Sequence, residues 1–291
     1  MKTAMLMALM TALLMLIGDF FGGLKGMTIM LFVGVAMNIF TYWNSDKMVL
    51  AHYDAQQVDR NSAPELYGIV ENLAKKANIP MPKVYIIDSP VPNAFATGRD
   101  PEHAAVAVNT ALADLLDKDE IAGVLAHEIS HVKHRDILIS TIAASMAGAI
   151  STIAQWGMFF GGGRDEDGES RNPIASILVM LLAPIAAMLI QMAVSRSREY
   201  MADKSGGELC GDPNALADAL LKIEAFAERR VMPGATEATA HMFIINPFSG
   251  VDAKQLFSTH PATEERVRLL REQARAMGEY CLLYTSPSPR D

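Results

Sequence analysis

The residues with the clearest chemical potential are the two histidines and the glutamate of segment 127–131 (HEISH), an H-E-x-x-H pattern. Residues four apart on a helix lie on one face, so both imidazoles could bind a single Zn²⁺ at about 2.0–2.1 Å. Glu128 is rotated by about 100° from His127 and would stand beside the metal. A carboxylate there can take a proton from water, whose pKa a bound metal lowers toward about 7. The pattern therefore predicts metal-assisted hydrolysis with Glu128 as the general base.

A catalytic zinc needs a third protein ligand and an open fourth position. We predict that Glu199, in segment 195–203 (SRSREYMAD), is this ligand. Asp203 lies one turn further along the same face, where it is expected to accept the free ring N–H of a ligand histidine. The alternative is a solvated, charged helix face without a metal. His134, three residues after His131, is expected to be an exposed helix-end histidine.

The other histidines are less informative. His260, in segment 258–261 (STHP), is predicted to lie in a loop before a helix. There it would either stabilise the oxyanion of a tetrahedral intermediate or serve as an ordinary turn residue, and the sequence leaves both open. His52, His103 and His241 have no partner at a motif spacing and are expected at the surface.

The zinc helix must be positioned by a folded domain. Asp117 and Glu120 have the spacing of a capping box and open a predicted helix over 121–134. A second capping box, Ser62 with Glu65, predicts a helix to about Ala77. Short strands are expected at 83–88 and 104–108, because these apolar runs are bounded by Pro and Gly turns. Further helices are predicted from Asp212-Pro213 to about Arg229 and over 262–277.

Four apolar stretches predict membrane segments, since a spanning helix needs about 20 apolar residues. Residues 137–160 and 174–194 are uncharged and reach that length, although buried core helices are the alternative. Residues 4–17 and 27–43 form a shorter pair that is expected to be a helical hairpin, and for residues 4–17 the alternative is a signal peptide. We therefore expect hairpins at 1–43 and 137–194, and a catalytic domain in two parts, 44–136 and 195–280. The Ser/Pro-rich tail 281–291 is expected to be non-native and to lie outside the fold.

Charge indicates an orientation and excludes some functions. The second pair of apolar stretches has basic residues on its outer sides, whereas the turn 161–173 between them holds four acids and two arginines. Because basic flanks remain in the cytoplasm, both polar parts are predicted to face it. The net charge of −8 argues against nucleic acid as a partner, and two cysteines are too few for a disulfide scaffold. The flanking basic residues are Lys133, Arg135, Arg196 and Arg198.

Taken together, segments 127–131, 195–203 and 258–261 resemble the HtpX family of membrane metallopeptidases, which is related to the CAAX prenyl endopeptidases. The likeness extends over about residues 1–278. It implies a mainly α integral membrane protein with a small β-sheet, a zincin-like catalytic domain and two transmembrane helical hairpins. It also implies one zinc per chain, held by His127, His131 and Glu199. His134 departs from the family pattern, where Asn is expected more often.

The resemblance also assigns a role to segment 93–98 (NAFATG), which is similar to a family segment ahead of the zinc helix. A short strand beside the zinc could pair with an extended substrate backbone, which makes Asn93, Ala94, Phe95 and Ala96 candidate substrate-binding residues. A plain loop is the alternative. The family context implies an endopeptidase of the bacterial inner membrane that cleaves misfolded or damaged membrane proteins in quality control. Its expected partners are membrane-protein or unfolded polypeptide substrates and the lipid bilayer.

Two other functional classes compete with a peptidase. A membrane chaperone or adaptor with a structural zinc would bind clients without cutting them, but it would have no need of Glu128 or of an open coordination position. A small transporter is disfavoured because the predicted spans carry almost no polar residues to mark a pathway.

Overall fold

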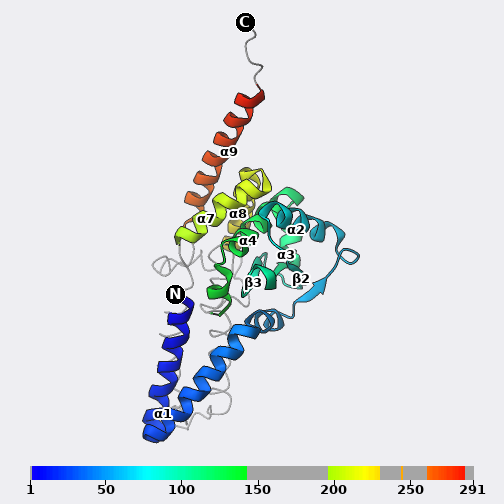
Figure 1. Cartoon of the computed structure of the whole chain (residues 1–291). Helices are drawn as coiled ribbons and strands as arrows, with labels where there is room; N and C mark the ends of the chain where they lie inside the picture. The colour runs from blue at the N-terminus through cyan, green and yellow to red at the C-terminus, as the bar shows by residue number, and fades with distance from the viewer. Residues whose placement is uncertain (1, 143–195, 230–243, 245–260, 286–291) are drawn as a thin grey trace, which may run out of the picture.

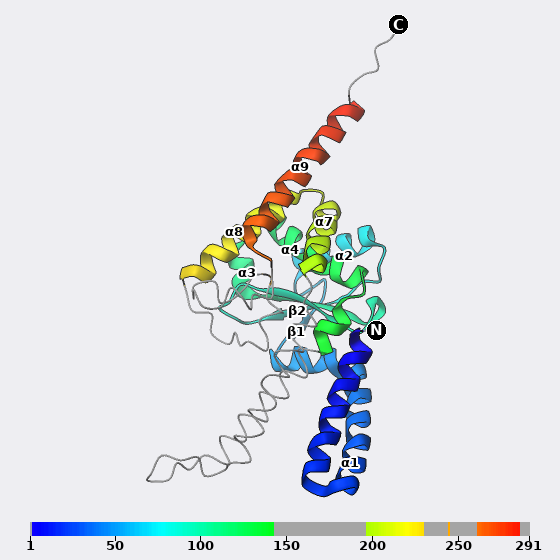
Figure 2. The same cartoon turned by 90° about the vertical axis from the view of Figure 1, so that its left-hand side faces the viewer.

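The computed structural model describes residues 2–142, 196–229, 244 and 261–285. Its first element, α1 (Lys2–His52), consists of two helical arms joined at Gly23, whose φ of 57° and ψ of −150° interrupt the helix. Glycine adopts this conformation without a Cβ penalty. Asn38 Nδ2 donates to Met7 O at 3.0 Å and to Thr11 Oγ1 at 2.8 Å, which joins the two arms. Figures 1 and 2 show the arms side by side, projecting from the rest of the molecule.

The second arm continues beyond the predicted end of the hairpin at residue 43. Residues Gly22–His52 form the one helix of the described chain that is long and apolar enough to cross a membrane, with a mean hydropathy of 1.6. Only 6% of its apolar window is buried, so it is not a core helix. Its last turns are different, because Val49 and Leu50 are buried under the sheet. The helix therefore continues past residue 43, the predicted end of the hairpin, and its last turns belong to the folded domain.

The sheet has four strands in the order β1-β2-β4-β3, with β3 at an edge. Strand β4 is parallel to β2 and antiparallel to β3, where Ala96 is opposite Val106. Every residue of β4 is buried. The strands are β1 Gln56–Val58, β2 Lys83–Ile87, β3 Ala94–Gly98 and β4 Ala104–Asn109. The predicted strands at 83–88 and 104–108 are therefore present.

The sheet separates two apolar layers (Figure 2). On one face, the end of α1 packs against Ile87, Phe95 and the alanines of β4. On the other face, the main core is built by the helices, with Val124, Leu125 and Ile129 of the zinc-motif helix at its centre. The remaining helices are η1 Pro101–His103, α2 Pro64–Ala77, α3 Thr110–Leu115, α4 Lys118–Lys133, α7 Arg196–Cys210, α8 Pro213–Arg229 and α9 Thr263–Thr285.

One predicted helix cap and one predicted helix end are wrong. Helix α2 begins at Pro64 with Ala63 as its N-cap and no side-chain cap, because the Ser62 hydroxyl and N–H bind the Asp59 carboxylate at 3.0 and 2.8 Å. The C-terminal helix was expected to end near Gly278 but continues to Thr285. A glycine lowers helix propensity by about 1 kcal/mol without ending a helix, unless it adopts a left-handed conformation. The first residues of the predicted tail 281–291 are thus helical.

Other predictions were confirmed. The Asp117–Glu120 capping box is present, with both reciprocal hydrogen bonds, and opens α4. Helix α8 has the predicted bounds. The predicted second hairpin, 137–194, lies outside the described residues apart from 137–142, which are helical.

The crossing of α4 and α7 positions the candidate site. A Cβ built on Gly206 would lie 2.9 Å from the backbone nitrogen of His127 and 3.0 Å from its Cα. Glycine at this position therefore lets the two helix backbones approach closely. Because α4 carries the two histidines and α7 carries Glu199, this contact determines how near these side chains come.

We predict that Gly206→Ala lowers the melting temperature of the detergent-solubilised protein, since overpacking at a tight contact costs about 1–3 kcal/mol. The matched control is Gly68→Ala in α2, where nothing lies within 4 Å of the added Cβ. That variant should be neutral or slightly stabilising, because alanine favours a helix. Equal melting temperatures for the two variants would contradict a tight α4–α7 crossing.

Candidate metal centre and active site

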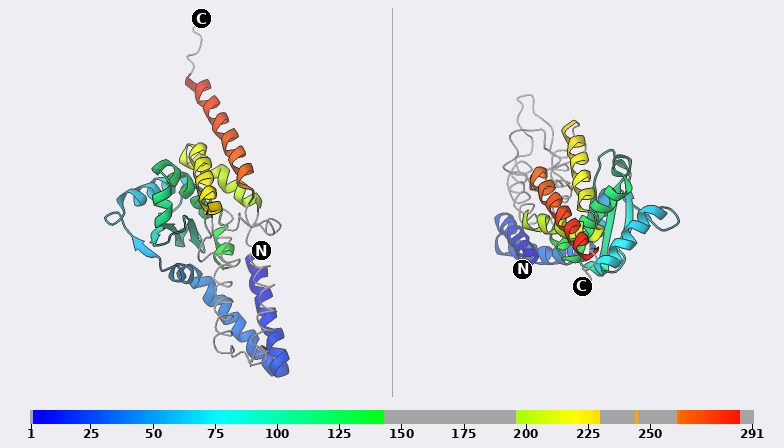
Figure 3. Two further views of the ribbon diagram at one scale, coloured as in Figure 1. Left: turned by 180° about the vertical axis from the view of Figure 1, so that it is seen from behind. Right: turned by 90° about the horizontal axis from the view of Figure 1, so that it is seen from above.

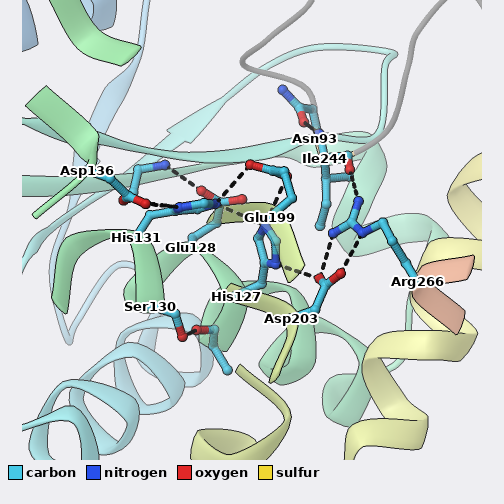
Figure 4. Close-up of polar contacts among 12 residues, drawn as sticks. Asn93, His127, Glu128, Ser130, His131, Asp136, Glu199, Asp203, Ile244 and Arg266 are labelled. Carbon is cyan, nitrogen blue, oxygen red and sulfur yellow. Dashed lines mark hydrogen bonds and ion pairs between the residues drawn. The ribbon is translucent and has the colours of Figure 1, made fainter. Parts of the chain in front are cut away.

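Three side chains from two helices converge on one point (Figure 4). His127 and His131 come from α4, and Glu199 comes from the first turn of α7. The two Nε2 atoms lie 3.2 Å apart, and the Glu199 oxygens lie 3.8 Å from His127 Nε2 and 3.6 Å from His131 Nε2. Tetrahedral zinc with bonds of about 2.05 Å separates its donor atoms by about 3.3 Å. The group therefore has both the chemistry and the spacing to hold a metal ion.

Each histidine is oriented by a carboxylate on its far side. His127 Nδ1 lies 2.8 Å from Asp203 Oδ1, and His131 Nδ1 lies 3.1 Å from Asp136 Oδ1. Carboxylates that hold Nδ1 turn the Nε2 lone pairs toward the opposite side. Both Nε2 atoms accordingly face Glu199, as a shared metal would require.

A buried arginine supports this arrangement from α9. The Arg266 guanidinium donates through Nε and Nη2 to the two oxygens of Asp203, both at 2.7 Å. Its Nη1 donates to the carbonyl oxygen of Ile244 at 2.6 Å. Burial alone would raise the pKa of Asp203, but Arg266 outweighs it and lowers that pKa to about 2. Asp203 is therefore ionised and holds its position between His127 and Arg266.

Glu128 lies on the other side of the histidines, against the sheet. Its Oε2 accepts a hydrogen bond of 2.9 Å from the backbone N–H of Ala96 in β3. Burial raises the pKa of Glu128, although the neighbouring His127 and His131 oppose the rise. A carboxyl group beside the metal-binding group with a raised pKa is suited to take up a proton and return it.

Negative charge accumulates around His131. Burial alone would lower the pKa of His131, but its hydrogen bond to Asp136 and the charges of Glu199 and Asp136 outweigh it and raise the pKa to about 9. Negative charges that hold a proton on an imidazole also favour a metal cation at the position of that proton. The metal must displace the proton to bind.

The candidate substrate-binding residues have different surroundings. Of the four, Ala96 contacts Glu128 directly. The Phe95 side chain packs on the end of α1, with its ring 5.5 Å from that of Tyr53. Asn93 is buried, and its Oδ1 accepts from the backbone N–H of Ile244 at 3.1 Å. Ala94, the first residue of β3, is also buried.

The other histidines of the described residues are not part of the metal-binding group. His134 is the exposed C-cap of α4, as expected. His52 and His103 are exposed, and His103 pairs with Asp100 at 2.6 Å. His241 and His260 lie outside the described residues.

Sequence reasoning missed two residues of the site. Asp136 lies five residues after His131, beyond the end of α4, where no helical spacing indicates a contact. A turn at Arg135, whose φ is 58°, brings Asp136 back toward the ring. Arg266 gives no signal in its own sequence neighbourhood, because a charged residue in a polar helix is ordinarily exposed. The one available hint was that Asp203, if buried, needs a cationic partner.

We predict that Arg266→Met lowers metal affinity by about 10–100-fold, because Asp203 loses the group that orients it. The variant should also lose stability, by about 3–5 kcal/mol, since a buried carboxylate is left unpaired. The measurements are chelator competition and thermal unfolding. Adding Asp203→Asn to Arg266→Met should restore part of the stability, because the uncompensated charge is removed.

The matched control is Arg268→Met, which changes an exposed arginine of the same helix that pairs with Glu265 and Glu272. It should leave metal affinity unchanged. Equal affinities for Arg266→Met and the wild type would show that Arg266 does not support the metal-binding group.

Comparison with known proteins agrees with this geometry. Residues 60–274 match the family model described as Peptidase family M48. The chain is 59% identical over 276 residues to "Protease HtpX homolog" of Burkholderia thailandensis and to that of Paraburkholderia phytofirmans, covering 94% of this chain and 96% of each relative. The solved structure described as "Crystal Structure of S. mikatae Ste24p" has a similar fold, with a TM-score of 0.50 at 21% identity over 89% of this chain and 61% of that one. The chain therefore belongs to peptidase family M48, a family of metallopeptidases.

Proposed function

We propose that the protein is a membrane-anchored zinc endopeptidase that cleaves misfolded or unfolded membrane proteins. The observation that carries this proposal is the convergence of His127, His131 and Glu199 beside the buried carboxyl group of Glu128. Membership of a peptidase family supports hydrolysis of peptide bonds as the reaction.

In this proposal His127, His131 and Glu199 are the ligands of a single zinc ion. The ligand set of two imidazoles and one carboxylate leaves a fourth position for water or substrate. When bound, zinc supplies an electrophile that polarises the peptide carbonyl and acidifies water. Asp203 and Asp136 hold the two imidazoles so that Nε2 of each is available to the metal.

Glu128 moves the protons. It takes a proton from the attacking water and returns it to the leaving amine, for which its raised pKa is suited. His260 is proposed to stabilise the oxyanion. It precedes Pro261 and the start of α9, and this helix already reaches the site through Arg266.

The edge strand β3 is proposed to bind the substrate backbone, with Asn93, Ala94, Phe95 and Ala96 forming this part of the site. Strand β3 is at an edge of the sheet, and its Ala96 N–H points at Glu128. An extended peptide beside β3 would pass in front of that carboxylate. Because main-chain hydrogen bonds do not depend on the side chain, such binding suits many unfolded segments.

The bilayer is the proposed environment of α1. Large apolar side chains are exposed along its second arm, and water would not tolerate so extensive an apolar surface. We further propose the bacterial inner membrane, with several spans and the catalytic domain in the cytoplasm, on the basis of the charge distribution around the apolar stretches. The exposed apolar side chains of the second arm of α1 include Leu24, Ile29, Phe32, Ile39 and Phe40.

A second candidate function is a chaperone or adaptor that binds clients at a structural zinc. The Ala96–Glu128 contact disfavours it, because a structural site does not require a buried carboxylate between the metal-binding group and strand β3.

We predict that Glu128→Gln retains about one zinc per chain but loses cleavage of an unfolded membrane-protein substrate, by a factor of about 10²–10⁴. The glutamine keeps the shape of the side chain and cannot accept the proton. Metal content and gel-based cleavage of the purified variant in detergent are the measurements. Glu208→Gln, an exposed position of α7, is the control and should behave as wild type. Turnover by Glu128→Gln at the wild-type rate would exclude the mechanism.

Zinc affinity should depend on pH in a defined direction. The pKa of His131 in the metal-free protein is raised to about 9, so zinc must displace a proton at any pH below that value. Apparent affinity should therefore rise by up to about tenfold per pH unit between about pH 6 and about pH 8, and level off near pH 9. Competition with a chelator of known pH dependence measures it. An affinity that is flat over this range would contradict the proton-retaining field around His131.

A further inference from the structure

Three boundaries between apolar and polar sequence lie close to the candidate site. The first follows Trp43, where the apolar run gives way to segment 44–47 (NSDK). The second is Asp136, the last charged residue before the uncharged stretch 137–160. The third is Arg196, the first charged residue after the uncharged stretch 174–194.

The length of α1 places the first boundary at one face of the hydrocarbon core. Trp43 lies 20 residues beyond the bend at Gly23, which corresponds to about 30 Å of helix and to the thickness of the core. Tyr42 and Trp43 stack edge to face, with ring centroids 5.3 Å apart. Tyrosine and tryptophan are enriched where the hydrocarbon meets the headgroups. Trp43 therefore marks the level of this boundary.

The edge strand β3 runs beside the last turns of α1, and its Gly98 end lies near the level of Trp43. Phe95 lies beside Tyr53, whereas the Arg99 guanidinium carbon, one residue beyond β3, is 4.7 Å from the Trp43 ring centroid. Ala96 precedes Arg99 by three residues, about 10 Å in an extended strand. The headgroup layer is itself about 5–8 Å deep, so the Ala96–Glu128 contact lies near its outer surface.

The other two boundaries give the same level independently. Asp136 binds His131 directly, and the helix that starts at Ile137 packs through Ile142 against Leu6 and Met10 of the first arm. Thr141 of this helix accepts a hydrogen bond of 3.2 Å from Gly98 N, at the boundary end of β3. In α7, Glu199 follows Arg196 by three residues, a rise of about 4.5 Å.

We propose that the metal-binding group lies at the level of the lipid headgroups, so that the peptidase cleaves peptide bonds within a few residues of the end of a membrane-spanning segment. This inference rests on the proposed function and specifies its substrates. An extended chain gains about 3.3 Å per residue, so three to five residues beyond the hydrocarbon are enough to reach Glu128. A site 30 Å above the membrane would require about nine residues.

The first test measures the level without relying on activity. The chain has two tryptophans, so Trp156→Phe leaves Trp43 as the single emitter. The full-length variant is reconstituted in phosphatidylcholine–phosphatidylglycerol vesicles that contain phospholipid brominated either near the carbonyl end or near the methyl end of its chains. Stronger quenching by bromine near the carbonyl end is expected. Stronger quenching by bromine near the chain end would place Trp43 at the bilayer centre and overturn the proposal.

The second test uses a set of substrates in the same vesicles. Each has one membrane span followed by a cytosolic tail, with one cleavable segment placed about 4, about 12 or about 24 residues beyond the last apolar residue. We expect the cleavage rates of the nearest and farthest segments to agree within about threefold. The nearest segment has a restricted orientation, but its high local concentration at the site compensates for this. Cleavage confined to the two distant positions would overturn the proposal.

A soluble peptide of the same segment separates the two levels of failure. If the wild-type protein cleaves the soluble peptide and the distant positions but not the nearest position, it is a peptidase, but its site does not lie at headgroup level. Absence of cleavage of every substrate, the soluble peptide included, would contradict the proposed function itself. Glu128→Gln provides the background for each measurement.

Discussion

The site depends on an imbalance of buried charge. Four carboxylates, from Glu128, Asp136, Glu199 and Asp203, surround two imidazoles, and within the described residues a single permanent cation, Arg266, is buried among them. Burying charges is expensive unless they are paired, and Arg266 neutralises Asp203 alone. The remaining negative charge is concentrated where the two Nε2 atoms meet Glu199. A divalent cation at that point would offset most of this remaining charge, which explains how these groups can lie so close together.

The same helices that hold the charges also connect the site to the rest of the molecule. Helix α4 passes the core on one face and β3 on the other, so a displacement of the edge strand would be transmitted to Glu128 through Ala96. Helix α9 contributes Arg266, which also binds Ile244 and thereby links the start of β3 at Asn93 with Asp203. Helix α9 packs against both α7 and α8, beside which it lies in Figure 3. The geometry of the site is thus maintained by segments that are distant in sequence.

Sequence reasoning succeeded where the signal was local. The H-E-x-x-H spacing, the Asp117–Glu120 capping box and the strands at 83–88 and 104–108 follow from periodicity and turn chemistry alone, and Glu199 was inferred from the need for a third ligand. It failed where contacts between residues distant in sequence determine the local structure. Asp136 and Arg266 reach the site through a backbone turn and a long-range ion pair that no spacing encodes, and Ser62 caps a preceding turn at Asp59 rather than α2. The end of α9 was misjudged because a glycine is only a weak helix breaker.

The central claim is that two imidazoles and one carboxylate from α4 and α7 share one metal ion. X-ray absorption spectroscopy at the zinc edge of the purified, zinc-loaded protein tests it directly. The account predicts nitrogen and oxygen neighbours at about 2.0–2.2 Å, including the multiple-scattering signature of two imidazoles, and no sulfur. The Glu199→Ala variant should lose one light neighbour or bind no zinc. A sulfur neighbour at about 2.3 Å, or an all-oxygen shell without imidazole, would contradict the account.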